Sequence, residues 1–229
     1  GHYAAVSQGE NPALLRAKDE NKDQTYFLYR VTKEALSRTI FPLGTLLKPE
    51  VKELAKELNL PVASKKESMG VCFVGDAGIR EFLTEFIDVV SGEIRELETD
   101  KLLGYHDGAI LYTIGQRHGL HLTDGLPYYV VKKDVSKNLV FVSKNLNSFN
   151  LWTRQIKLKD VVLRQELDSR APLKVRIRHR APLVSARFNP KTNMLDFDEE
   201  QKSLTPGQSV VFYAGENYEI CIGGGIITL

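Results

Sequence analysis

The hydrophobic residues of this chain change their spacing once, near Ser91, and that change limits the folds it can adopt. Up to Val90, apolar residues recur at the period of an α-helix. After Ser91, short runs of β-branched and aromatic residues are separated by Gly, Asp and Asn, as in strands joined by turns. A helical part followed by a strand-rich part predicts an α+β chain of more than one domain.

Two helices are expected before residue 60. Thr32 suits the N-cap of a short helix, and Pro49 suits the first turn of a longer one. The sequence Phe-Pro-Leu-Gly at 41–44 breaks regular structure between them. The longer helix is expected to end at Asn59 and Pro61. Its apolar residues, at i, i+3, i+4 and i+7, are Val51, Leu54, Ala55 and Leu58.

A third helix is expected after Asp76, a residue type that suits an N-cap. Its apolar stripe consists of Ile79, Phe82, Leu83, Phe86, Ile87 and Val90. A continuous stripe at this spacing is typical of a helix face packed in a core, so these residues are assigned to the core and not to a site.

Short β-like runs are expected at 92–94, 106–115 and 127–132. From about Leu151 the strands are more regular, and their turn signals predict a small antiparallel barrel or sandwich. The three glycines at 223–225 are not followed by a helix, which favours a turn or bulge over a phosphate-binding loop.

The predicted organisation has three parts. Residues 1–77 form an α-rich remnant, 78–150 a small mixed central domain, and 151–229 an antiparallel β-barrel or sandwich.

Composition excludes several classes of protein. The 229 residues are 42% hydrophobic and 26% charged, and no apolar run approaches the roughly 20 residues that span a membrane. The net charge of +2 is too small to identify a nucleic-acid partner. The two cysteines, Cys72 and Cys221, make no disulfide framework and no zinc-like Cys/His spacing, so no metal site is expected. They favour a reducing compartment, with the cytoplasm or an organelle matrix as the expected location.

Cys72 lies in an apolar run within SKKESMGVCFVGD, residues 64–76. Free cysteines are among the most buried residues, which favours a structural role. Lys65, Lys66 and a helix beginning at Asp76 would instead lower the pKa of the thiol, which favours a reactive one. The residues alone leave both interpretations open.

The segment Leu173–Lys191 is basic and contains no acidic residue. If 174–180 is a strand, the side-chain period of two places four basic residues on one face, with Val175 and Ile177 toward the core. This face is either a solvated edge or a phosphate-binding surface. Its members are Lys174, Arg176, Arg178 and Arg180.

Two further polar segments are less specific. The triplet Lys22, Asp23 and Gln24 is typical of a turn entering a strand. Arg117, after a glycine turn, suits either a phosphate contact or the surface.

Nine motifs, in order along the whole chain, resemble the family of tRNA-specific 2-thiouridylases, called MnmA in bacteria. They are GHYA at 1–4, KDQTYFL at 22–28, FPLG at 41–44, the run 48–75, GYHDGAILYTIGQRHGL at 104–120, YYVVKKD at 128–134, KVRIRHR at 174–180, TPGQSVVFY at 205–213 and GGGII at 223–227. The number of motifs in correct order makes the resemblance specific.

The resemblance implies ATP-dependent transfer of sulfur to C2 of the wobble uridine, residue 34 of tRNA, with Mg²⁺ accompanying the ATP. Cys72 matches the cysteine that carries a persulfide received from a sulfur-relay protein or a cysteine desulfurase, and a persulfide is a strong nucleophile. Gly1 matches a glycine that lines the ATP site, and residues 1–77 match the C-terminal part of the family's α/β nucleotide-binding domain, which in the family is followed by a small central domain and a C-terminal β-barrel that binds tRNA. The positions that match tRNA contacts are His2, Lys22, Asp23, Gln24, His179, Arg180 and Gln208.

The chain departs from the family pattern in what it lacks. These residues contain neither the family's Gly- and Ser-rich pyrophosphate loop nor its first catalytic cysteine. We therefore expect that this chain alone does not adenylate tRNA. Besides part of an enzyme, a tRNA-binding module without chemistry and a persulfide carrier remain open.

Overall fold

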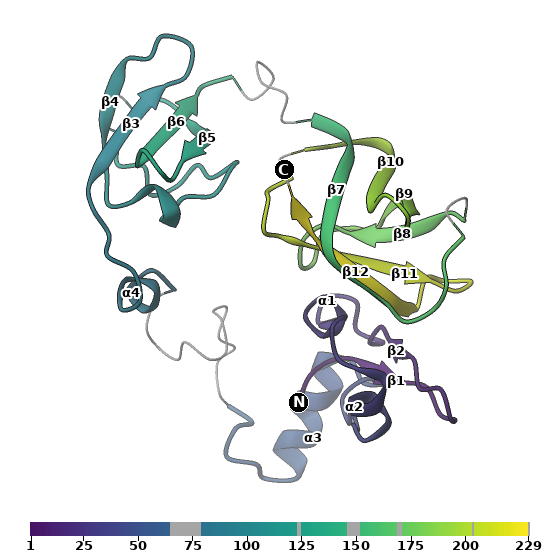
Figure 1. Cartoon of the computed structure of the whole chain (residues 1–229). Coiled ribbons are helices and arrows are strands. Elements are labelled where there is room, and N and C mark those ends of the chain that lie inside the picture. The colour runs from purple at the N-terminus through teal and green to yellow at the C-terminus, as the bar shows by residue number, and fades with distance from the viewer. Residues whose placement is uncertain (65–78, 123–124, 146–151, 169–170, 203, 229) are drawn as a thin grey trace. The chain divides into compact units, whose positions relative to one another are not determined.

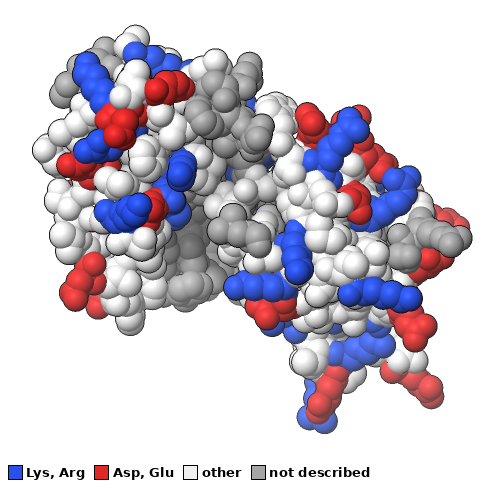
Figure 2. Space-filling view, turned by 45° about the horizontal axis from the view of Figure 1, so that its top comes forward, with Lys and Arg blue, Asp and Glu red and all other residues white. Residues whose placement is uncertain are grey.

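The computed structural model describes residues 1–64, 79–122, 125–145, 152–168, 171–202 and 204–228, and Figure 1 shows its elements. The chain folds into two compact units. The first combines Gly1–Lys65 with Thr153–Leu229, so that both ends of the chain fold together, and the second is Lys66–Trp152. No described helix is long and apolar enough to cross a membrane. On the face in Figure 2, basic and acidic side chains are interspersed, in keeping with the net charge of +2.

The first unit is built on one antiparallel sheet in the order β1-β2-β12-β11-β8-β9-β10-β7. Because β7 also pairs with β12, six of these strands close into a barrel. The predicted antiparallel barrel is therefore confirmed. The strands are β1 (Ala5–Val6), β2 (Leu14–Leu15), β7 (Trp152–Leu163), β8 (Leu173–Arg176), β9 (Val184–Asn189), β10 (Met194–Lys202), β11 (Ser209–Ala214) and β12 (Ile220–Thr228).

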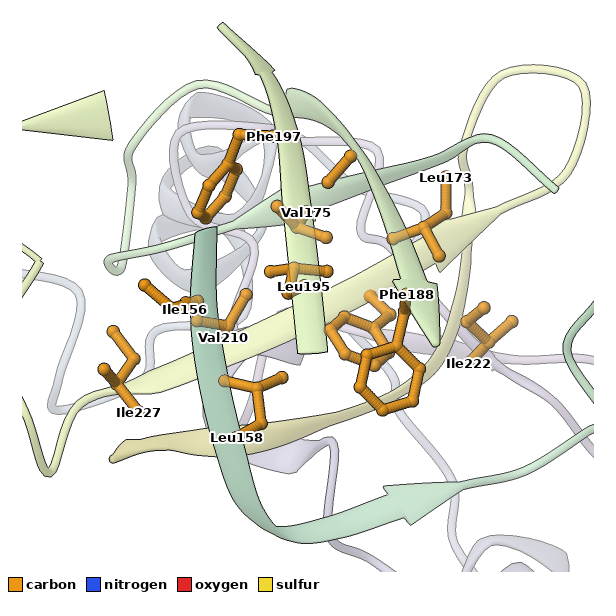
Figure 3. Packing of buried hydrophobic residues seen from close by; sticks show 12 residues of the cluster. Ile156, Leu158, Leu173, Val175, Phe188, Leu195, Phe197, Val210, Ile222 and Ile227 are labelled. Atoms are coloured by element: carbon orange, nitrogen blue, oxygen red, sulfur yellow. The ribbon is translucent and has the colours of Figure 1, made fainter. Parts of the chain in front are cut away.

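Alternation along β11 separates two cores. Val210 points into the barrel (Figure 3). Phe212 belongs to the same core and meets Phe188, with ring centroids 5.0 Å apart. Val211 and Tyr213 point outward and are buried against the N-terminal segment. A strand covered on both faces reads as a continuous apolar run, as β11 does. The barrel and the N-terminal segment thus share this strand as a common wall.

The glycines of β12 form the bulge that the sequence predicts. The register of β12 against β11 skips one residue, because Tyr213 faces Cys221 whereas Phe212 faces Gly223. Gly223 has φ +141°, and a Cβ there would lie 2.0 Å from the carbonyl oxygen of Val162. Upstream of this bulge β12 pairs with β2, and downstream it pairs with β7. The bulge therefore lets one strand serve both the N-terminal segment and the barrel.

The helices of the first unit are short. They are α1 (Thr25–Leu28), α2 (Lys33–Ser37) and α3 (Lys48–Glu57). The Thr32 hydroxyl accepts from the Ala35 amide at 3.2 Å, Pro49 lies in the first turn of α3, and Asn59 follows α3 with φ +51°, all as predicted. The segment after Gln24 was expected to be a strand and is helical instead.

The second unit contains a four-stranded sheet in the order β4-β3-β6-β5, with β3 and β6 parallel. Its elements are α4 (Ile79–Thr84), β3 (Gly92–Glu96), β4 (Leu102–His106), the 3-10 turn η1 (Ala109–Leu111), β5 (Tyr129–Asp134) and β6 (Leu139–Ser143). The expected runs at 92–94 and 127–132 thus correspond to β3 and β5.

Two predictions for this unit are wrong. Residues 106–115 do not form one strand, because the His106 ring accepts from the Gly108 amide and the Asn138 side chain accepts from the Ala109 amide, which bends the backbone into η1. Over its described side chains the apolar stripe is not core, since Phe86 is 70% and Val90 66% exposed; the expected N-cap, Asp76, lies outside the described residues. The helix ends at Thr84, so the helical period no longer aligns the later residues.

The glycine bulge generates a first prediction. Gly223→Ala is expected to destabilise the first unit by at least about 2 kcal/mol, because both the positive φ and the Val162 carbonyl oppose a methyl group. Native-state hydrogen exchange of the β11 and β12 amides measures the loss in this unit alone.

Gly9→Ala is the matched control for this change. Gly9 also has a positive φ, +118°, but a Cβ there meets no atom within 4 Å. The loss in free energy of unfolding is therefore expected to be about 1 kcal/mol. Equal losses in the two variants would contradict a role for close packing at Gly223.

Candidate nucleic-acid interface

The helix α1 is held against the barrel by hydrogen bonds at both ends. The Tyr26 hydroxyl donates to the Ser209 carbonyl oxygen at 2.8 Å, at the start of β11. The Arg164 guanidinium donates to the carbonyl oxygens of Leu28 and Tyr29 at 3.3 and 2.7 Å. These carbonyls lie at the C-terminal end of α1, where a cation satisfies groups that have no helical partner. The position of α1 is thus fixed by barrel residues.

Asp23 precedes α1 and forms a buried ion pair with Arg176 of β8. The Arg176 Nη1 lies 2.7 Å from Asp23 Oδ2, and the two side chains are 5% and 0% exposed. The Asp23 carboxylate also accepts from the Thr25 hydroxyl and from the amides of Ala17 and Thr25. Tyr213 completes the network, since its hydroxyl lies 3.0 Å from that of Thr25.

Burial of the network changes the pKa of Tyr213. Desolvation raises the pKa of the Tyr213 hydroxyl well above its ordinary value, so that it stays protonated at neutral pH. The Arg176 guanidinium lies 5.5 Å from the centre of the Tyr213 ring, within range of a cation–π contact.

The basic strand expected at 174–180 is shorter in the structure, where it corresponds to β8. Leu173 and Val175 are buried in the barrel as alternation requires, but β8 ends at Arg176. Lys174 donates to the Ser185 hydroxyl at 2.7 Å, and Arg176 is inside the protein. The prediction of one face with four basic residues is wrong, because two of them are used by internal contacts.

The other two basic residues lie in the loop between β8 and β9. The amide of Ala181 donates to the Arg178 carbonyl at 3.1 Å, which closes a turn. Arg180 is exposed and adopts φ +64°, a left-handed conformation that costs an L-residue about 1–2 kcal/mol. A rigid turn thus presents Arg180 to solvent.

His179 in this turn packs on the rings of α1. Its ring centroid lies 4.6 Å from that of Phe27 and 6.2 Å from that of Tyr26. Desolvation lowers the pKa of the imidazole, and the positive charges of Arg176 and Arg180 lower it further. His179 is therefore neutral at pH 7. Its Nδ1 is buried and has no hydrogen-bond partner among the described residues.

Gln208 lies in the turn between β10 and β11. This turn is closed by the Gln208 amide, which donates to the Thr205 carbonyl at 3.2 Å. The next residue, Ser209, accepts the hydroxyl of Tyr26. The side-chain oxygen of Gln208 is buried and finds no donor within the described part of the chain.

Tyr26 thus contacts the ring of His179 and the backbone of Ser209, the residue that follows Gln208. We call the surface around this contact the α1 face. It consists of Tyr26, Phe27, Arg178, His179 and Arg180. Sequence reasoning did not single out Tyr26 or Phe27, although both belong to the KDQTYFL motif. No periodicity marks them, because α1 has only four residues.

The remaining sequence-predicted positions have different surroundings. Gln24 binds a partner within the protein. Its side-chain oxygen accepts from the Tyr3 backbone amide at 2.9 Å, and its backbone amide donates to the Tyr3 carbonyl oxygen at 2.8 Å. Lys22 is half-buried, and its amide donates to the Asp19 carbonyl. The structure therefore does not bring the whole Lys22–Gln24 triplet to one surface.

Gly1, which the resemblance assigns to the ATP site, is exposed, as is His2. The atom nearest to a Cβ at Gly1 is an apolar one, Leu43 Cδ1 at 3.2 Å. Among the described residues, no group of three or more His, Cys, Asp or Glu side chains is able to hold a metal ion.

The two cysteines differ in what the structure describes. Cys72 lies outside the described residues. Cys221 is fully buried beside Tyr213, and burial raises the pKa of its thiol to about 12. A thiol that is inaccessible and protonated is a poor nucleophile, so Cys221 is structural.

Three family models match the chain in succession. They are the tRNA methyl transferase HUP domain over residues 1–76, the tRNA methyl transferase PRC-barrel domain over 80–144, and the aminomethyltransferase beta-barrel domain over 153–227. The predicted fold class, an α+β chain with a partial nucleotide-binding domain, a small central domain and a C-terminal antiparallel barrel, is confirmed.

The sequence is also similar to curated proteins named tRNA-specific 2-thiouridylase MnmA. One from Pediococcus pentosaceus is 40% identical, covering 99% of this chain and 63% of the relative. Those from Listeria monocytogenes and Streptococcus sanguinis are 39% and 38% identical, each covering 99% of this chain and 62% and 63% of the relative. The chain thus spans less than two thirds of the length of these relatives.

The buried ion pair generates a second prediction. Asp23→Asn is expected to destabilise the first unit by about 3–5 kcal/mol, because it leaves the Arg176 charge buried without its counter-ion. Adding Arg176→Met removes that charge, so the double variant is expected to lose less than the two single changes combined. Hydrogen exchange of the β11 and β12 amides reports both results.

The exposed pair Arg187–Asp198 serves as the control. Its atoms lie 2.8 Å apart with side chains 54% and 41% exposed, so Asp198→Asn is expected to cost less than about 1 kcal/mol. Strictly additive losses at Asp23 and Arg176 would contradict their coupling.

Proposed function

This chain belongs to the family of tRNA-specific 2-thiouridylases, and from this we propose that it binds tRNA through the α1 face and takes part in sulfur transfer to C2 of the wobble uridine. The observation that carries the proposal is the packing of the His179 ring on the rings of Tyr26 and Phe27, which places the loop of His179 and Arg180 against α1. His179, Arg180 and Gln208 match tRNA contacts of the family.

The chemistry of the α1 face suits RNA. Arg180, exposed on a rigid turn, offers a guanidinium to a phosphate. His179 and Gln208 are neutral side chains of a kind that hydrogen-bonds a 2′-hydroxyl or a base edge, and their buried atoms, Nδ1 and Oε1, are not the ones that face solvent. RNA is recognised mainly through phosphates, 2′-hydroxyls and shape, so a few placed groups suffice without a broad basic field.

Asp23 and Gln24 act in this proposal as positioning residues. Their side chains bind internal partners, Arg176 and the Tyr3 amide, and these contacts fix the start of α1. A change at either residue then weakens tRNA binding by displacing α1. Lys22 and His2 lie on the same N-terminal segment and are proposed as direct contacts.

Cys72 is proposed to carry the persulfide, supplied by a sulfur-relay protein or a cysteine desulfurase. ATP first adenylates the C2 oxygen of the uridine; the terminal sulfur then attacks C2, and the carbon–oxygen bond breaks with AMP as the leaving group. A second thiol attacks Cys72, which forms a disulfide with it and leaves the transferred sulfur on C2. Cys221 does not qualify as that thiol, because it is fully buried and its pKa is raised. Gly1 is proposed to line the site of the ATP.

Binding of tRNA tests the first half of the proposal. Arg180→Ala is expected to weaken binding and to lower the slope of log K against log salt by about 1, because one phosphate contact is lost. The slope is measured by fluorescence anisotropy of labelled tRNA over a salt series. Arg187→Ala, which removes a cation already paired with Asp198, is expected to leave the slope unchanged.

If the wild-type chain shows no affinity for tRNA, the proposed function is wrong. If Arg180→Ala leaves the slope unchanged while the wild type binds, Arg180 does not contact a phosphate.

Thiol reactivity tests the second half. In the native chain one cysteine is expected to react rapidly with a thiol reagent, and Cys72→Ser is expected to abolish that reaction whereas Cys221→Ser leaves it unchanged. The same pair of variants is then loaded with a cysteine desulfurase, L-cysteine and pyridoxal phosphate, and the persulfide is located by mass spectrometry. Rapid labelling of Cys221, or of neither cysteine, would overturn the assignment.

A further inference from the structure

Phe27 is an exposed aromatic ring at the centre of the α1 face. It is 58% exposed, although two other rings contact it. The Tyr26 ring meets it edge-on, with centroids 5.4 Å apart and planes at 89°, and the His179 ring lies 4.6 Å away at 44°. The ring is therefore supported by neighbours while more than half of the residue stays open to solvent.

The neighbours of Phe27 are held in place and do not share its exposure. Tyr26 is tied to the Ser209 carbonyl, and desolvation raises the pKa of its hydroxyl to about 12, so it remains a neutral donor. His179 is half-buried and neutral at pH 7. Phe27 thus rests on two uncharged rings, one of which is hydrogen-bonded to the barrel.

Positive charge lies near the rings that support Phe27. The Arg178 charge acts on Tyr26 and the Arg180 charge acts on His179, and Arg180 is exposed with a left-handed backbone. Strained non-glycine residues of this kind persist where the surrounding structure enforces them, often at functional sites. An apolar ring beside cations complements a ligand with a flat face and an anionic backbone.

We propose that Phe27 is a stacking platform for an unpaired base of tRNA, with His179 supporting the ring from behind and Arg180 contacting the adjoining phosphate. The proposal rests on tRNA binding by the α1 face and adds the part of the RNA that this face recognises. A base in a duplex has both faces covered by its neighbours, whereas an unpaired base offers one to an aromatic ring. The platform therefore selects a looped or flipped nucleotide.

Phe27→Ala tests the platform. It is expected to weaken binding of the 229-residue chain to unfractionated tRNA by at least about fivefold. The salt slope is expected to stay unchanged, because no charge is removed. Affinity for a blunt RNA duplex is expected to be the same in the variant and the wild type. Phe27→Tyr keeps a stacking ring and is expected to restore tRNA affinity.

Ile40→Ala is the matched control for loss of exposed apolar surface. Ile40 belongs to the same unit and is 85% exposed, and it lies outside the α1 face, so its loss is expected to leave tRNA binding unchanged.

A spectroscopic readout reports stacking directly and does not depend on the alanine variant. Phe27→Trp is made together with Trp152→Phe, so that the introduced indole is the only one in the chain. Its emission is expected to be quenched by tRNA and not by the duplex, because only an unpaired base stacks on it.

The outcomes separate the two proposals. If the wild-type chain does not bind tRNA, both the proposed tRNA recognition and the platform are wrong. Normal wild-type binding that is unaffected by Phe27→Ala, or reduced equally for tRNA and duplex, would overturn the platform alone. Unquenched emission in the tRNA complex of the tryptophan variant would do the same.

Discussion

The ion pair between Asp23 and Arg176 joins the two ends of the chain, and the α1 face depends on it. Arg176 is the last residue of β8 and faces outward from the barrel, beside Val211 in register. Asp23 immediately precedes Gln24, the N-cap of α1. One contact of 2.7 Å therefore sets the place of the helix on the barrel wall and lies next to the loop that carries His179. Because burying two charges costs desolvation free energy that offsets their attraction, the pair contributes more to fixing the position of α1 than to the net stability of the fold.

A buried pair of this kind favours one arrangement over its alternatives. The apolar cluster of Leu14, Tyr29, Val211 and Tyr213 drives the N-terminal segment onto the barrel, but apolar contact is not directional. Slippage of α1 along β11 would leave the Arg176 charge unpaired in a dry environment, at a cost of several kcal/mol. Arg164, which binds the carbonyls at the other end of α1, opposes slippage in the same way.

The sequence was informative where a residue acts through its own backbone preference. Thr32 as an N-cap, Pro49 in the first turn and the glycine bulge at Gly223 are local effects, and all three are present. It was misleading where a side chain had a distant partner. The alternation through 174–180 is indistinguishable from a basic edge strand until Asp23 is placed against Arg176. Of the candidate site, the positions of His179, Arg180 and Gln208 came from motif order, whereas Tyr26 and Phe27 required the fold.

The end of β8 at Arg176 explains why the α1 face exists at all. Had the strand continued to Arg180, the period of two would have placed His179 and Ile177 on the same side, toward the barrel interior. Ending the strand releases the turn that places the His179 ring on Phe27 and leaves Arg180 in solvent. Arg176 is thus buried in an ion pair, whereas the residues that follow it are placed at the surface. A basic run that looks uniform in sequence is divided by the fold into an anchor and a contact.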